Sequence, residues 1–218
     1  MTGITLVAPI HPRPSISLIA EGLPPHGANL YLGDTEGARD LALLRRLGIS
    51  TVVNCAVNLD INFVTEPDYA ATATLCAAGP GAIRYHKLGL VDGAGNPELM
   101  LLAGYYLLSG ALHQEFPERA SYPRRERGNI LVHCRGGRSR SVAVVALFLH
   151  VERSEAFPTM ESAIAHVRQH RELQPDEWFE TPKPELTEAA SRAAGWIRRI
   201  RAESSLPGQG DSAPGAAR

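Results

Sequence analysis

The sequence has little of what would tie it to an oxidising compartment, a membrane or a nucleic acid. Its three cysteines, Cys55, Cys76 and Cys134, form neither an even disulfide set nor a CxxC metal pair. The longest apolar run, residues 142–149, is too short to cross a bilayer, and the N-terminus has no basic region of a secretory signal. A net charge of −1 gives no basic field that favours nucleic acid. These absences predict a soluble, cytoplasmic protein without a transmembrane segment.

Lysine is also scarce. Only Lys87 and Lys183 occur, so arginine supplies 20 of the 22 basic residues, and arginine is the residue suited to bidentate phosphate contacts. The hydrophobic content of 44% excludes a wholly disordered chain, and 218 residues suit one domain with appendages. We expect an N-terminal arm at 1–27, one domain at 28–203 with a surface insertion at about 114–128, and a disordered tail at 204–218.

Apolar periodicity predicts strands that alternate with helices. The expected strands are 29–33, 49–55, 83–88 and 129–133, and the expected helices are 38–47, 97–113, 141–151, 160–171 and 184–201. Thr35 is expected to cap the first of these helices. The alternation predicts an α/β fold, with a central mixed, mostly parallel sheet flanked by helices.

The sequence HCRGGRSRS, residues 133–141, carries the chemistry. A strand delivers Cys134 into a glycine-containing loop that leads directly into an apolar helix. Loop N–H groups and the helix dipole together make an anion site. A cysteine at the base of such a loop should have a pKa below the usual value of about 8.5 and act as a thiolate nucleophile.

Each neighbour of the cysteine has an expected role. The guanidinium of Arg140 can match two phosphate oxygens, and Ser141 can donate a hydrogen bond to the thiolate. His133 can orient the loop backbone from behind. The candidate substrate-binding residues are Arg135, Gly136, Gly137, Arg138 and Ser139. A buried cysteine alone is more often a small hydrophobe, but the joint pattern between a strand and a helix favours phosphate chemistry.

At these residues the chain resembles the dual-specificity branch of the protein tyrosine phosphatase superfamily. Residues 29–34 and 47–54 resemble that branch's opening strand and second strand, and residues 163–171 resemble the helix that follows its cysteine loop. The resemblance covers roughly residues 28–180. It implies the fold of that branch and a cysteine-dependent phosphomonoester hydrolase that works through a phosphocysteine, with no metal or cofactor.

The resemblance also implies a general acid on a loop before the cysteine. LGLVDGAGNP, residues 88–97, occupies that place, so Asp92 would protonate the leaving oxygen and then activate the water that hydrolyses the phosphocysteine. The residues alone also fit an ordinary turn, because Asp-Gly and Asn-Pro are common turn pairs.

The sequence fits more than one class of substrate. The expected partners are a protein carrying phosphotyrosine, phosphoserine or phosphothreonine, or an anionic phosphorylated small molecule or lipid. Arg135 and Arg138 make the loop resemble that of phosphoinositide and phosphatidylglycerophosphate phosphatases, although solvated arginine explains them equally well. A catalytically inactive phosphate-binding module is a further alternative. Cys55 is either a core thiol or a redox partner of Cys134.

Overall fold

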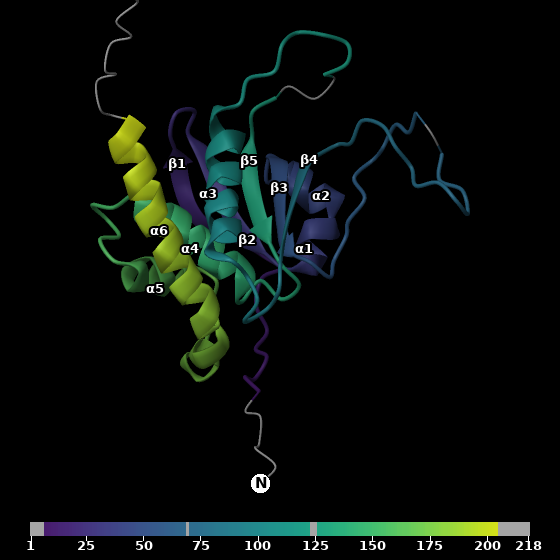
Figure 1. The fold of residues 1–218 in the computed structure, drawn as a ribbon. Coiled ribbons are helices and arrows are strands. Elements are labelled where there is room, and N and C mark those ends of the chain that lie inside the picture. Colours follow the sequence, from purple (N-terminus) through teal and green to yellow (C-terminus); the bar gives the residue numbers. More distant parts are fainter. Residues whose placement is uncertain (1–6, 69, 123–125, 205–218) are drawn as a thin grey trace, which may run out of the picture.

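A computed structural model describes residues 7–68, 70–122 and 126–204 (Figure 1). Its sheet has five strands in the order β1-β2-β5-β3-β4. The strands are β1 (Ile16–Leu23), β2 (Ala28–Gly33), β3 (Ile49–Ala56), β4 (Arg84–Leu90) and β5 (Asn129–His133). β1 and β2 are antiparallel, and all other neighbouring strands are parallel. The predicted α/β fold with a mixed, mostly parallel sheet is confirmed.

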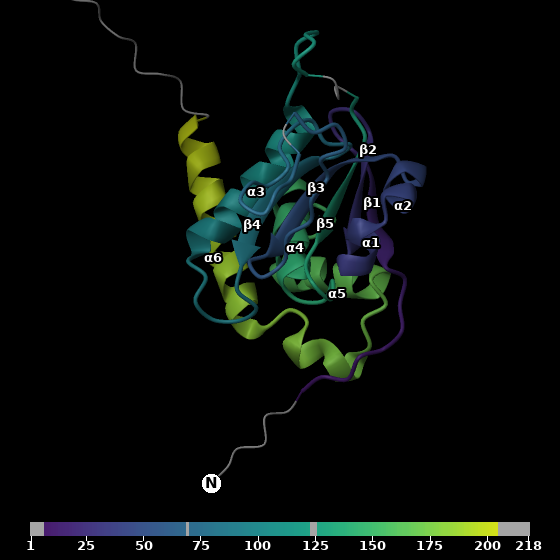
Figure 2. The ribbon, with the colours of Figure 1, turned by 90° about the vertical axis from the view of Figure 1, so that its right-hand side faces the viewer.

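Helices cover both faces of this sheet (Figures 1 and 2). They are α1 (Thr35–Arg39), α2 (Leu41–Arg46), α3 (Glu98–His113), α4 (Arg140–Glu152), α5 (Met160–His170), the short 3-10 helix η1 (Pro175–Glu180) and α6 (Pro184–Ser204). Helices α3, α4, α5 and α6 share the larger core with one face of the sheet, and α1 and α2 share a smaller core with the other face. α4 lies at the centre, with every residue from Arg140 to His150 buried.

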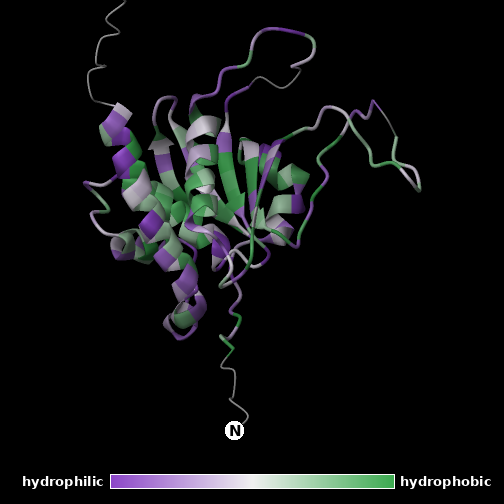
Figure 3. Cartoon of the chain, viewed as in Figure 1, coloured by the Kyte–Doolittle hydropathy of each residue, from purple (hydrophilic) through white to green (hydrophobic). Residues whose placement is uncertain are grey.

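The alternation of side chains along the central strands explains the two cores. In β5, Ile130 and Val132 face the larger core, whereas Leu131 faces the smaller one. β3 divides in the same way between Val53 and Val52. Because both faces are covered, these strands have continuous apolar sequences rather than alternating ones. Figure 3 shows the resulting hydrophobic centre of the molecule.

The N-terminal region differs from the expected arm. Residues 16–23 form β1, which pairs with β2 at the edge of the sheet. Prolines at 12, 14, 24 and 25 flank this strand and obscured its short apolar pattern. Residues 7–15 do run over the surface without regular structure, and residues 1–6 of the predicted arm lie outside the described residues.

The expected helix at 38–47 is two short helices, and its predicted cap is wrong. Asp34 caps α1 by accepting from the Gly37 N–H at 3.0 Å. Asp40 ends α1 and caps α2 by accepting from the Leu43 N–H at 2.9 Å. An aspartate carboxylate is a strong N-cap, so Asp34 takes the role that the prediction gave to the neighbouring threonine.

Two further expectations concern the surface. The described residues of the predicted insertion, 114–122 and 126–128, are mostly exposed. The predicted disordered tail lies outside the described residues except for Ser204, which ends α6. None of the helices in the described ranges is long and apolar enough to span a membrane.

Candidate active site

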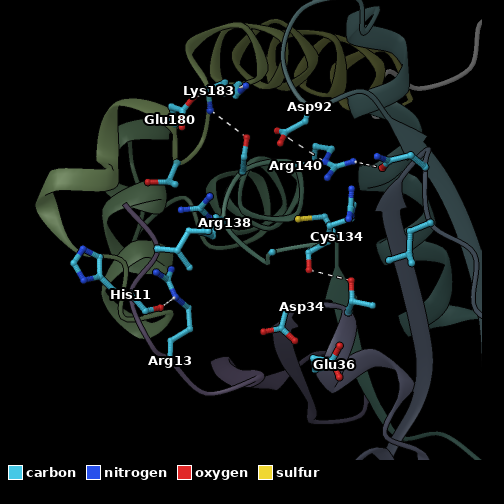
Figure 4. Close-up of a pocket in the computed structure, with 18 residues that line it drawn as sticks. His11, Arg13, Asp34, Glu36, Asp92, Cys134, Arg138, Arg140, Glu180 and Lys183 are labelled. Atoms are coloured by element: carbon cyan, nitrogen blue, oxygen red, sulfur yellow. Dashed lines mark hydrogen bonds and ion pairs between the residues drawn. The ribbon is translucent and has the colours of Figure 1, made fainter. Parts of the chain in front are cut away.

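The predicted site residues meet at the carboxyl edge of the parallel strands, where α/β folds commonly bind ligands. A cavity of ≈ 1030 Å³ opens there (Figure 4). Cys134 follows β5, Arg140 begins α4, and Asp92 follows β4 by two residues. All three line the cavity. Two segments far apart in the sequence, the loop from Cys134 to Arg140 and the segment after β4, therefore supply one site.

Cys134 lies at the base of the cavity, and the residue is only 2% exposed. Burial alone would raise its pKa, but the Ser141 hydroxyl, the Arg140 charge and the N–H groups of Ser141 and Arg138 lower it, and the pKa falls below its ordinary value. The Sγ–Oγ distance to Ser141 is 3.2 Å. The loop thus stabilises the thiolate, which is the nucleophilic form.

The guanidinium of Arg140 is held by two hydrogen bonds, and one of its N–H groups has no hydrogen-bond partner among the described residues. Its Nη1 donates to Asn58 Oδ1 at 3.2 Å and to the Leu90 carbonyl at 3.4 Å. Its Nε lies 3.9 Å from Asp92 Oδ1 and is buried without a hydrogen-bond partner among the described residues. A buried guanidinium N–H that lacks a partner is costly unless a ligand accepts from it. The arrangement is suited to an oxyanion in the cavity.

Asp92 stands on a braced loop. Its side chain is 44% exposed at the cavity. Asn96 fixes the loop from inside, because its side chain accepts from the Val91 N–H at 2.8 Å and donates to the carbonyls of Val91 and Gly93 at 2.9 and 2.8 Å. The turn that the sequence predicted is therefore present. It places Asp92 at the cavity, so the turn and the candidate role of Asp92 are compatible.

His133 lies behind the loop and is fully buried. Burial lowers its pKa to about 4, against opposing effects of its hydrogen bond at Cys134 and of Asp34, so the imidazole is neutral near pH 7. Its Nδ1 lies 3.2 Å from the Cys134 carbonyl oxygen. Since a carbonyl only accepts, Nδ1 carries the proton and donates to the loop backbone at Cys134, and the orienting role of His133 stays a prediction.

The residues between the cysteine and the arginine differ in what they contact. Arg135 is exposed, and its carbonyl accepts from the N–H and hydroxyl of Thr35. Arg138 donates to the Pro9 carbonyl at 3.0 Å and lies 3.5 Å from Glu177. The buried Ser139 hydroxyl accepts from the Lys183 N–H at 3.3 Å. Arg138 and Ser139 are therefore tied to neighbouring segments.

A fully buried arginine supports the loop from outside it. Arg171, just after α5, donates to the Gly137 carbonyl and to Asp34 Oδ2, both at 3.2 Å, and to Ser17 Oγ at 3.0 Å. It joins the loop to β1 and to the start of α1. Sequence reasoning missed it, because only tertiary contacts distinguish it from the many other arginines.

Gly136 and Gly137 have different structural requirements, which gives a first prediction. Gly137 has a φ of +60°, and a Cβ there would lie 2.6 Å from the Gly33 carbonyl oxygen. At Gly136 a Cβ would meet only the flexible Arg138 side chain, at 3.6 Å. We expect Gly137→Ala to lower the free energy of unfolding by about 1–3 kcal/mol or more, and Gly136→Ala to change it little. Chemical denaturation of the two variants tests this, and equal stabilities would contradict it.

The thiol of Cys134, the guanidinium of Arg140 and the carboxylate of Asp92 thus line one cavity, an arrangement suited to binding a phosphate group. No family model matches the sequence. Among curated proteins, the chain is 27% identical to mouse dual specificity protein phosphatase 19 over 139 residues, which cover 64% of this chain and 51% of that protein. It is 30% identical to human dual specificity protein phosphatase 13B over 155 residues, which cover 69% of this chain and 65% of that protein. The matches thus span about half to two thirds of these relatives.

Solved structures agree on the fold. Human DUSP28 superposes with a TM-score of 0.55 at 19% identity, covering 88% of this chain and 99% of that one. The Yvh1 phosphatase domain from Chaetomium thermophilum gives 0.54 at 16% identity, covering 79% and 93%. The predicted resemblance to the dual-specificity branch is confirmed, and the fold is the one which those phosphatases share.

Proposed function

We propose that this protein is a cysteine-dependent phosphomonoester hydrolase of the dual-specificity type. The observation that supports this best is the pairing of a thiol whose pKa is lowered with an arginine whose Nε is buried and has no hydrogen-bond partner among the described residues. Such a thiol is suited to act as a nucleophile, and such an arginine has an N–H group available to bind an anion. A module that only binds phosphate would need the arginine but not an activated thiol.

In the proposed reaction the Cys134 thiolate attacks phosphorus, forming an S–P bond as the bond to the ester oxygen breaks. Asp92 gives its proton to the departing oxygen. The Asp92 carboxylate then takes a proton from a water molecule that attacks the phosphocysteine, which releases phosphate and restores the thiolate. Arg140 and the loop N–H groups hold the phosphoryl oxygens throughout, and Ser141 stabilises the thiolate as it leaves.

Hydrolysis of para-nitrophenyl phosphate tests this proposal. Rapid acid quenching followed by mass spectrometry should find a phosphoryl group on the peptide that contains Cys134. Phosphate binding without turnover would favour the inactive module instead. Phosphoryl transfer to a residue other than Cys134 would reject the mechanism.

Ser141 provides a prediction on pH dependence. Its hydroxyl helps to lower the pKa of Cys134, so Ser141→Ala should raise that pKa. Because the thiolate is the active form, the rising acid limb of kcat/KM should move to higher pH. Hydrolysis of the phosphocysteine should also slow, since the departing thiolate loses a hydrogen bond. pH profiles and burst kinetics measure the two effects, and an unshifted acid limb would count against the role of Ser141.

The contacts of Arg138 support a phosphoprotein substrate over a multiply phosphorylated lipid or inositol phosphate. Arg138 already meets Glu177 and the Pro9 carbonyl, which leaves Arg135 as the loop arginine without an ion pair among the described residues. The cavity lining carries charges of both signs, with Asp34, Glu36 and Glu180 beside its arginines and Lys183, so it is not the uniformly basic surface that suits a multiply phosphorylated ligand. We propose phosphoproteins of the cytoplasm as the substrates.

A further inference from the structure

The N-terminal segment 8–14 lies across one side of the active site and is fastened there at several points. The Ala8 N–H donates to Glu180 at 3.2 Å, and the His11 ring meets Asp176 at 3.0 Å. Both acceptors belong to η1, more than 160 positions further along the chain. Figure 4 shows His11 and Arg13 on the side of the cavity opposite Arg140.

One buried carboxylate is central to this attachment. Glu177 has a fully buried side chain and accepts two hydrogen bonds from Arg13 Nη2, at 2.9 and 2.7 Å. The Arg13 side chain is itself only 5% exposed. Arg13 and the Gln174 N–H outweigh the effect of burial and keep the pKa of Glu177 below its usual value. A buried pair of this kind fixes its two segments together, because removal of one partner leaves the other charge buried and unpaired.

The same carboxylate connects the segment to the catalytic loop. Glu177 Oε1 lies 3.5 Å from Arg138 Nη1, which in turn donates to the Pro9 carbonyl at 3.0 Å. The loop, the N-terminal segment and η1 thus meet at Glu177. Arg138 therefore lines the cavity while it joins the loop to the N-terminal segment and η1.

A fixed segment at this place leaves an apolar side chain at the cavity. Ile10 lines the cavity and is 81% exposed, although its neighbour Ala8 is buried. Cys134, at the base of the same cavity, marks where the phosphoryl group would react, and ≈ 1030 Å³ is far more than a phosphoryl group fills. Contact between this exposed isoleucine and an apolar group of a bound ligand would remove apolar surface from water and so favour binding.

We propose that segment 8–14 is a substrate-recognition wall, clamped by Arg13 and Glu177, on which Ile10 contacts an apolar side chain next to the phosphorylated residue of a phosphopeptide. This inference rests on the proposed function and adds to it the chemistry of the substrate around the phosphate. Ile10 is then a specificity-determining residue, and Glu177 is a positioning residue that acts through Arg13.

Ile10→Asp tests the recognition wall. The substrates are two phosphotyrosine peptides that differ only in having leucine or aspartate on both sides of the phosphotyrosine, together with para-nitrophenyl phosphate. We expect the wild type to prefer the leucine peptide, and Ile10→Asp to lower the ratio of leucine-peptide to aryl phosphate kcat/KM about fivefold to tenfold, chiefly through KM. Leu75→Asp, which also changes an exposed leucine-sized residue (59% exposed) but outside the cavity lining, is the matched control and should keep the wild-type ratio.

The outcomes separate this inference from the proposed function. A wild type that does not discriminate between the peptides, or a variant that loses activity equally on all three substrates, overturns the recognition wall. Absence of any aryl phosphate turnover by the wild type rejects the proposed function, and the wall with it.

Glu177→Gln tests the clamp by a separate route. Loss of the carboxylate should release segment 8–14, detected as faster proteinase K cleavage there, and should raise KM for the leucine peptide more than for para-nitrophenyl phosphate. A melting curve confirms that the variant is folded. If the segment is cleaved faster but the KM values rise equally, the segment has only a structural role and the inference fails.

Discussion

Cys134→Ser is expected to abolish turnover while leaving anion binding largely intact. A hydroxyl in this loop is not ionised near neutral pH, so the nucleophile is lost, whereas Arg140 and the loop N–H groups remain. Loss of a catalytic nucleophile typically costs on the order of 10⁶ in kcat. Steady-state hydrolysis of para-nitrophenyl phosphate measures the activity, and the rise in melting temperature with added tungstate measures anion binding.

Cys76→Ser is the matched control, because Cys76 is an exposed free cysteine outside the cavity lining. It should keep wild-type kinetics. Turnover by Cys134→Ser near the wild-type rate would remove Cys134 from the mechanism. Loss of tungstate binding together with activity would indicate that the serine disrupts the loop rather than the chemistry.

Asp92→Asn is expected to lower kcat by roughly 10²–10⁴, the usual scale for a general acid–base group. The loss should be largest for an alkyl phosphate such as phosphoserine, whose leaving oxygen needs a proton. It should be smaller for para-nitrophenyl phosphate, whose leaving group departs readily as an anion. Comparison of the two substrates therefore separates proton donation from general damage to the loop.

Asp60→Asn provides the control for this experiment, since Asp60 is an exposed aspartate that pairs with Lys87 outside the cavity lining. It should affect neither substrate. If Asp92→Asn slows both substrates equally and only slightly, Asp92 is a turn residue supported by Asn96, and another acid must protonate the leaving group.

The position of the loop from Cys134 to Arg140 was predictable from the sequence because its folding signals are local. The strand before Cys134, the glycines after it and the helix that begins at Arg140 lie within one short stretch, and Cys134, Gly136 and Arg140 line the cavity. Asp92 needed the resemblance as well, because the sequence alone could not separate a proton donor from a turn.

The supporting residues were not predictable for the opposite reason. Arg13 meets Glu177 across 164 positions, and Arg171 meets Asp34 across 137. No local pattern marks a charged residue as buried, since charges in a sequence are usually exposed. β1 was also not predicted, because its pairing with β2, rather than its own proline-flanked sequence, makes it a strand.

The contacts of Arg171 have a consequence for how the protein is made. A growing chain that has emerged as far as α5 contains every strand of the sheet, Cys134 and the helix α4 that follows it. It still lacks Arg171, whose guanidinium binds the Gly137 carbonyl and Asp34. It also lacks Glu177, whose carboxylate binds Arg13. The anion cradle is therefore completed late in synthesis, and until then the nascent chain carries its thiol without the arginine that secures the loop.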